Sequence, residues 1–164
     1  MHQDVLEQVY RQYYRQVYLY ALSLSRNVAL AEDLTSDTFF KAFLSLEQSG
    51  GNIKLWLLRV CKNLWFDHLR KSKRLDAIPP EERTDLKSED NTLEALLESE
   101  KNSRLYAAIH QLPAAQREAV TLFYFGGLHL KEIASILNMG EGATRTLVYR
   151  SRRRLKDLLK EEEQ

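Results

Sequence analysis

The sequence predicts an all-α protein made of two small helical domains joined by a flexible acidic linker. Only 6 Gly and 3 Pro occur in 164 residues, and apolar residues recur mostly three and four positions apart, which is the spacing of one helix face. An acidic stretch that contains Pro79-Pro80 and few large apolar residues interrupts this periodicity, as is typical of a linker. We therefore expect one domain at residues 1–74, a linker at 75–91 and a second domain at 92–164.

Three helices are expected in the N-terminal domain. An apolar stripe runs through residues 5–24. Asn27 can cap the next helix, whose apolar side extends to Leu46, because its side-chain oxygen can accept a free N–H of the first turn. The loop 49–52 then breaks the chain, and a third helix follows at about 53–70. Its expected buried face is Leu57, Val60, Cys61 and Leu64.

Helical periodicity in the C-terminal domain begins at Leu93, halts at Pro113 and resumes as far as Gly126-Gly127. Two further helices are expected at about 130–137 and 141–160. Their short connection and the basic character of the second one suggest a paired motif.

The segment at about 130–154 has the pattern of a helix-turn-helix. Two helices packed nearly perpendicular need a small residue at their closest approach, which Ala134 supplies, and Ile133, Leu137 and Val148 would share the core. With Val148 inward, the second helix can present its outer face to a major groove. The outward residues are then Thr146, Tyr149, Arg150 and Arg153. An ordinary hairpin with solvated arginines is the alternative, but four arginines within residues 150–154 favour DNA.

The third helix carries a second polar stripe at three- and four-residue spacing. It consists of Arg59, Lys62, Asn63, Phe66 and Arg70. Cations, an aromatic ring and an amide together suit a single nucleic-acid strand, because they neutralise phosphates, stack on bases and bind unpaired base edges. The alternative is that Trp56 and Trp65 belong to the core and that the cations are merely solvated. We prefer this alternative for the two tryptophans, and nucleic-acid binding for the polar stripe.

The second helix begins with acids at Glu32, Asp33 and Asp37. Acidic side chains near a helix N-terminus stabilise the helix through its dipole, which is one explanation of this cluster. The other is a docking face for a basic protein surface.

The net charge of +1 conceals a segregation of charge along the chain. Residues 54–74 sum to +6 and 141–156 to +5, whereas 75–100 sum to −7 and the last eight residues to −3. The total excludes a uniformly basic nucleic-acid binder, but the two basic blocks still indicate local DNA contacts.

The sequence gives little support for an enzymatic function. Cys61 is the only cysteine, so no internal disulfide or thiolate-rich zinc site is expected, and the four histidines lack metal-ligand spacing. There is no glycine-rich phosphate loop or nucleophile elbow. We expect no metal, no cofactor and no catalytic residue. The absence of a signal-like N-terminus and of a long apolar run favours a cytoplasmic protein.

Together these motifs resemble the extracytoplasmic-function (ECF, group IV) sigma factors of bacterial RNA polymerase, in the sigma-70 family. The resemblance to sigma region 2 rests on residues 31–39, Trp56-Leu57-Leu58-Arg59, Asn63 and Asp67-His68-Leu69-Arg70. The resemblance to region 4 rests on Leu112-Pro113, Gln116-Arg117-Glu118, the helix-turn-helix and residues 150–155. It covers nearly the whole chain in order, and it implies a region 2 helical bundle followed by a region 4 domain.

The resemblance also implies roles for individual residues. Arg145, Thr146, Tyr149 and Arg150 match positions that face the −35 element, and we add Arg153. Asn63 matches a position that holds the opened −10 element, and the loop 49–52 corresponds to one that receives a flipped base. The face that docks on the β′ clamp helices of core polymerase is matched by Glu32, Asp33, Leu34, Asp37 and Phe39. Thr144 stands at a usually apolar position and Leu147 at an often basic one, which leaves the −35 sequence open.

The partners implied are core RNA polymerase, through its β′ clamp helices and β flap, promoter DNA, and an inhibitory anti-sigma factor that is often membrane-bound. The linker of such proteins threads toward the polymerase active-centre cleft. The residues by themselves are also compatible with two other classes of protein. One is a stand-alone helix-turn-helix regulator that binds duplex operators, and the other is a protein-interaction adaptor made of two helical bundles.

Overall fold

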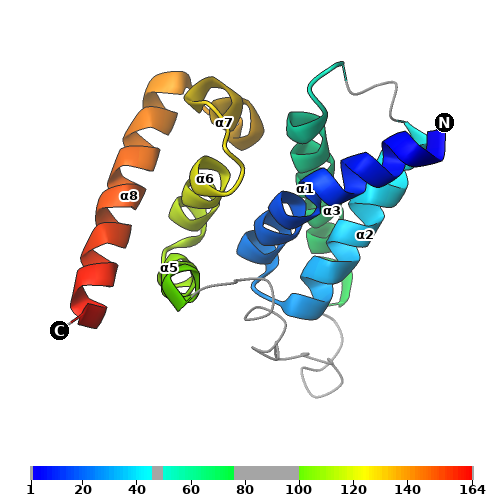
Figure 1. Cartoon of the computed structure of the whole chain (residues 1–164). Coiled ribbons are helices and arrows are strands. Elements are labelled where there is room, and N and C mark those ends of the chain that lie inside the picture. The colour runs from blue at the N-terminus through cyan, green and yellow to red at the C-terminus, as the bar shows by residue number, and fades with distance from the viewer. Residues whose placement is uncertain (1, 46–49, 76–99, 164) are drawn as a thin grey trace. The chain divides into compact units, whose positions relative to one another are not determined.

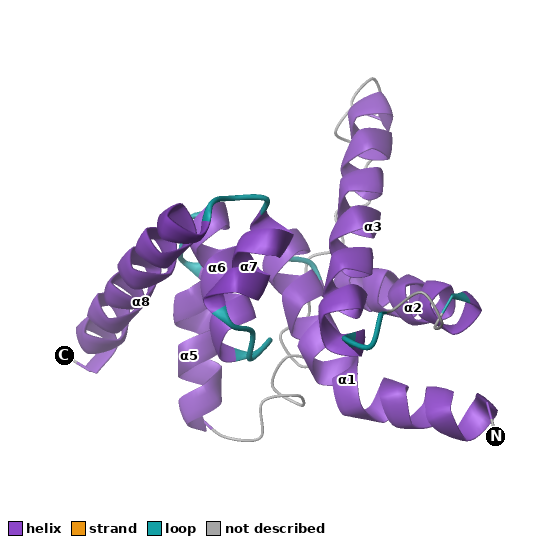
Figure 2. Ribbon diagram, turned by 90° about the horizontal axis from the view of Figure 1, so that it is seen from above, coloured by secondary structure: helices purple, strands orange, loops and turns teal. Residues whose placement is uncertain are grey.

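The computed structural model describes residues 2–45, 50–75 and 100–163, and every regular element in these ranges is an α-helix (Figures 1 and 2). The predicted all-α class is confirmed. The helices are α1 (His2–Ser25), α2 (Val28–Leu44), α3 (Ile53–Leu75), α5 (Glu100–His110), α6 (Ala114–Tyr124), α7 (Leu130–Leu137) and α8 (Glu141–Glu163).

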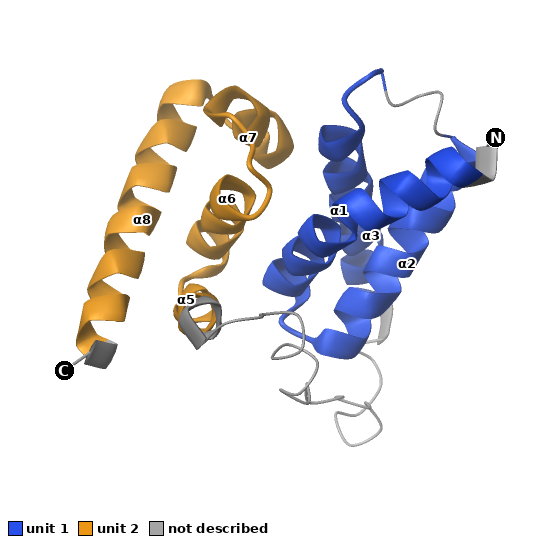
Figure 3. Ribbon diagram, in the orientation of Figure 1, with its two compact units in different colours: residues 1–88 blue, residues 89–164 orange. Residues whose placement is uncertain are grey.

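The chain forms two compact units, residues 1–88 and 89–164 (Figure 3). The first contains α1 to α3, and the second contains α5 to α8. Apart from Leu75, the last residue of α3, the predicted linker at 75–91 lies outside the described residues, as does the expected helical stretch near Leu93. The bounds of the linker therefore stay a prediction.

In unit 1, α1, α2 and α3 pack against one another, and α1 is buried on all sides through residues 17–23. Asn27 caps α2 as predicted, because its Oδ1 accepts the N–H of Leu30 at 2.9 Å. Leu57 and Cys61 are fully buried, as expected, while Val60 and Leu64 are only half-buried. Leu58 is also fully buried, since two neighbouring helices widen the covered face of α3.

Unit 2 has its own aliphatic core. Its buried cluster is Ala108, Ile109, Leu112, Val120, Leu155 and Leu158, contributed by α5, the residue before Pro113, α6 and α8. The buried Arg117 side chain donates from Nη1 to the Leu112 carbonyl at 3.1 Å, which ties the start of α6 to the end of the α5 segment. Gly126 allows the chain to leave α6, because a Cβ there would lie 2.6 Å from the Leu122 carbonyl oxygen.

Candidate nucleic-acid interface

The helix-turn-helix forms as the spacing predicted. The backbone N–H of His129 donates to Glu132 Oε1 at 3.0 Å, which secures the start of α7. At its end Asn138 takes the left-handed conformation (φ 55°, ψ 47°), and the Met139 N–H reaches the Ala134 carbonyl at 3.0 Å. Asn tolerates this conformation better than other residues with a Cβ. The turn needs no glycine.

The core of the motif is confirmed for its central residues. Ile133, Ala134 and Val148 are buried, and Leu137 is half-buried. Thr144 is buried although it is polar, because its Oγ1 donates to the Gly140 carbonyl at 2.9 Å and so needs no other partner. The departure from an apolar residue at this position is therefore accommodated within the helix.

The outer face of α8 carries all five residues predicted to face the −35 element. Each of them is exposed, and 63% of Tyr149 is accessible. They are Arg145, Thr146, Tyr149, Arg150 and Arg153. Thr146 donates its hydroxyl to the Gly142 carbonyl at 3.2 Å, which leaves its oxygen as an acceptor. The arrangement offers guanidinium donors, a phenol ring and a hydroxyl to one external surface.

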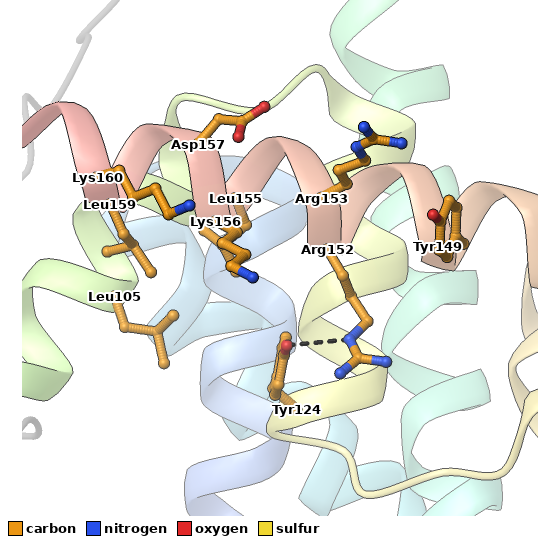
Figure 4. Close-up of a pocket in the computed structure, with 10 residues that line it drawn as sticks. All are labelled: Leu105, Tyr124, Tyr149, Arg152, Arg153, Leu155, Lys156, Asp157, Leu159 and Lys160. Carbon is orange, nitrogen blue, oxygen red and sulfur yellow. Dashed lines mark hydrogen bonds between the residues drawn. The ribbon is translucent and has the colours of Figure 1, made fainter.

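One of the four clustered arginines turns away from this surface. The Nε–H of Arg152 donates to the hydroxyl of Tyr124 on α6 at 3.1 Å (Figure 4). Its guanidinium also lies over the ring of Phe123. Beside this contact lies an open groove of about 700 Å³ within unit 2. Its lining combines aliphatic residues of α5 and α8 with cations of α8. Sequence reasoning counted Arg152 only as added charge.

The polar stripe on α3 is also exposed over most of its length. Arg59, Asn63, Phe66 and Arg70 are exposed, and Lys62 is half-buried. The ammonium of Lys62 lies 5.5 Å from the centre of the Phe66 ring, which brings a cation and a stacking surface together. Arg70 forms an ion pair with Asp67 one turn earlier.

Asn63 lines a small cavity of about 160 Å³ between α2 and α3. The other lining residues are Lys41, Ser45, Trp56 and Val60. Trp56 and Trp65 are both half-buried, so neither is the fully buried core residue that we expected. The loop before α3 has Gly50 and Gly51 at positive φ, and Asn52 Oδ1 accepts the Leu55 N–H at 3.2 Å. The first residue of the expected loop 49–52 lies outside the described residues.

The predicted docking residues on α2 divide into two groups. Glu32, Asp33 and Asp37 are exposed, but Leu34 and Phe39 are buried, with 4% and 2% of their surfaces accessible. Phe39 packs its ring 5.0 Å from that of Tyr10 on α1. Leu34 and Phe39 therefore hold α2 in the bundle and cannot themselves offer a docking surface.

The sequence reasoning missed the aromatic residue that α2 exposes most. Phe40 is 66% accessible and Leu44 is 72% accessible. Positions 33, 37, 40 and 44 lie on one helix face, so these two side chains continue the row that Asp33 and Asp37 begin. The spacing of these positions already indicated the exposed row, but Phe39 and Phe40 are adjacent in sequence, and only packing shows which of the two rings is covered.

Glu32, also exposed on α2, lies near two tyrosines of α1. Burial raises the pKa of Tyr18 to about 12, and the charge of Glu32 contributes to the same direction. Burial likewise raises the pKa of Tyr14. The Tyr18 hydroxyl is buried and makes no hydrogen bond to the residues that the structure describes.

Comparison with known proteins agrees with this geometry. The sigma-70 region 2 family model matches residues 9–75, and the sigma-70 region 4 family model matches residues 102–155. The ECF RNA polymerase sigma factor SigM of Bacillus subtilis is 30% identical in an alignment 163 positions long, which covers 93% of this chain and 94% of that protein. The chain belongs to the ECF sigma factors. BldN of Streptomyces coelicolor, another ECF sigma factor, is 35% identical over 95% of the chain, which spans 61% of BldN.

A solved structure extends the likeness of this ECF sigma factor to the fold. The sigma factor RpoE of Bartonella quintana, determined in complex with the anti-sigma factor NepR, matches with a TM-score of 0.69 and 28% identity. The match covers 94% of this chain and 96% of that one. CnrH, in complex with the cytosolic domain of CnrY, shares the fold with a TM-score of 0.62 at 18% identity.

The two family matches assign the ECF sigma factor's helices to regions. Region 2 corresponds to most of α1 and to α2 and α3, and region 4 corresponds to α5 through the first two thirds of α8. No group of three or more potential metal ligands occurs among the described residues. Within the same residues, no helix is long and apolar enough to span a bilayer.

Proposed function

We propose that this ECF sigma factor directs core RNA polymerase to promoters, with α8 reading the −35 duplex and α3 capturing the melted −10 strand. The observation that carries the proposal is the pairing of two different nucleic-acid faces in one chain. One is the outer face of a helix-turn-helix, and the other is a cation–aromatic–amide row on a separate unit. A regulator that binds only duplex operators has no use for the second face, so this alternative is not favoured.

At the −35 element, α8 would enter the major groove with the face opposite Val148. Arg150 and Arg145 can donate two hydrogen bonds each to a guanine edge, and Tyr149 can contact a thymine methyl group. Arg153, one turn beyond Tyr149, is suited to a phosphate. The exposure of all these side chains supports this assignment.

At the −10 element, the α3 row would hold one separated strand. Phe66 offers a stacking surface beside the Lys62 ammonium, and Arg59 supplies charge for the backbone. The amide of Asn63 opens onto the cavity that Lys41 and Trp56 also line, where an extruded base could be bound by its edge. Such capture offsets an unstacking cost of a few kcal/mol per base, so strand opening requires no hydrolysis by this subunit, and we assign it no enzymatic activity.

Docking on core polymerase would use the outer row of α2. Asp33 and Asp37 can meet basic residues of the β′ clamp helices, and Phe40 and Leu44 can be covered in the same contact. In unit 2, the groove between α5 and α8 offers an apolar floor from Leu105 and Leu159 for the β flap. Polymerase would then be held by both units.

An anti-sigma factor is the expected inhibitor, and we place this sigma factor in the cytoplasm, where a membrane-bound inhibitor could retain it. The solved complex of RpoE with NepR supports such a partner. The exposed apolar side chains of α2 are a suitable target, because covering them would block the proposed polymerase contact.

Reconstitution with core polymerase tests the function. Full-length protein is added to core enzyme, and run-off transcripts are scored on a pool of genomic promoters. We expect specific transcripts that depend on both components, and weak binding of promoter duplex by the protein alone. A duplex shifted tightly without polymerase, together with no transcript from any promoter, would indicate a stand-alone regulator instead.

A further inference from the structure

Arg152 is the point at which the recognition helix is tied to α6 by a directional contact. Its Nε–H donates to Tyr124 Oη at 3.1 Å (Figure 4). Its guanidinium carbon lies 4.8 Å from the centre of the Phe123 ring and 5.7 Å from that of Tyr124. The partners are 28 residues apart in sequence. At about 100° per residue, Arg152 lies at the border of the buried face of α8, which lets it fold back onto α6.

We propose that Arg152 is a positioning residue for promoter recognition and that Arg152, Phe123 and Tyr124 form a clamp that sets the rotation of α8 about its axis. This inference rests on the proposed function, since it concerns how the −35 face is aimed. Tyr149 and Arg153 flank Arg152 on the helix, and both line the same groove. Their direction toward DNA therefore depends on how α8 is turned at this level.

The aliphatic contacts between α6 and α8 bury one face of α8, and Arg152 adds a contact of defined orientation to them. Val120, Leu155 and Leu158 are aliphatic, and hydrophobic contacts are non-directional. A planar guanidinium that both stacks and donates a hydrogen bond has a defined orientation. Side chains extend about 5–6 Å from a helix axis, so a turn of about 20° moves their ends by about 2 Å. A hydrogen bond to a base edge does not survive such a displacement.

Arg154 supplies a matched control. It has the same charge, is exposed on the same helix, and lies at the opposite border of the buried face. A role for Arg152 in charge alone would be shared by Arg154. A role in positioning would be shared instead by Tyr124, which carries no charge and lies on another helix.

The test uses holoenzyme made from core polymerase and the full chain. Its probes are a promoter selected from a genomic pool and the same promoter with a scrambled −35 element. The variants are Arg152→Lys, Arg152→Met, Tyr124→Leu, Tyr124→Phe and Arg154→Lys, together with the double variant Tyr124→Leu/Arg152→Lys. The readouts are the ratio of binding to the two promoters and its dependence on salt, measured well below the melting temperature of each variant.

We expect Arg152→Lys and Tyr124→Leu each to lower the ratio of binding to the two promoters about 3- to 10-fold. The salt dependence should stay unchanged. The double variant should lose no more than the single variant with the larger loss. Tyr124→Phe should cause a smaller loss, and Arg154→Lys none. If Tyr124→Leu does not fold, Tyr124→Phe must still lower the ratio for the proposal to stand. Full discrimination in Arg152→Lys would overturn the clamp. So would an equal loss on both promoters in Arg152→Met with a salt slope reduced by about 1, which marks a phosphate contact. Wild-type holoenzyme that fails to discriminate would refute the proposed function itself.

Discussion

Replacing Phe40 with alanine should weaken the binding of this sigma factor to core polymerase more than the loss of any single acid on α2. Phe40 is 66% accessible and lies in the row of Asp33, Asp37 and Leu44. A phenylalanine buries about 150–250 Å² when fully covered, so docking can remove about 130 Å² of this side chain from water. At about 25 cal/mol per Å², the gain is at most about 3 kcal/mol. An exposed ion pair contributes only about 0–1 kcal/mol.

The measurement is a competition between labelled wild-type protein and each variant for core enzyme. Phe40→Ala should lose about 1–3 kcal/mol, or roughly 5- to 150-fold in affinity, because alanine retains part of the contact. Leu69→Ala is the control, since Leu69 is 37% accessible and belongs to α3 and not to the row on α2. Both residues are exposed, so the thermal stability of both variants should stay close to that of the wild type. Equal affinity of Phe40→Ala and Leu69→Ala for core enzyme would refute the docking surface.

Three other outcomes are expected. Arg150→Ala should cost about 1–3 kcal/mol of −35-dependent recognition in transcription assays if Arg150 reads a base, whereas an equal loss on all sequences would reduce it to a phosphate contact. Asn63→Ala should impair promoter opening more than initial binding, so unchanged permanganate footprints on the −10 element would contradict its role. Unit 1 should lose stability as the pH rises from about 10 toward 12, because burial raises the pKa of Tyr18 to about 12 and the unfolded chain binds its proton less tightly. Tyr18→Phe should reduce this loss of stability at alkaline pH. It should change the stability near neutral pH little, since the hydroxyl makes no hydrogen bond to the described residues. Unfolding curves that shift equally with pH in both proteins would contradict this role of Tyr18.

The sequence by itself determined the features that depend on neighbours within one or two helical turns. The apolar periodicity indicated the described helices, Asn27 indicated the start of α2, and the position of Val148 indicated which side chains of α8 face outward. The same helical phase put Lys62 and Phe66 on one side of α3. Each of these relations follows from 3.6 residues per turn and from the hydrogen bonds of a helix end.

The tertiary structure decided which side of each helix is covered by another helix. Phe39 and Phe40 are adjacent in sequence, but α1 packs on the first and leaves the second exposed. Arg152 is a cation among other arginines, as expected of a DNA contact, yet its side chain contacts Phe123 and Tyr124 on α6. The spacing of residues within α8 does not predict this contact. The cavity of Asn63 likewise needs side chains from both α2 and α3. Burial and pairing of this kind depend on contacts between residues far apart in the chain, and local helical geometry does not specify them.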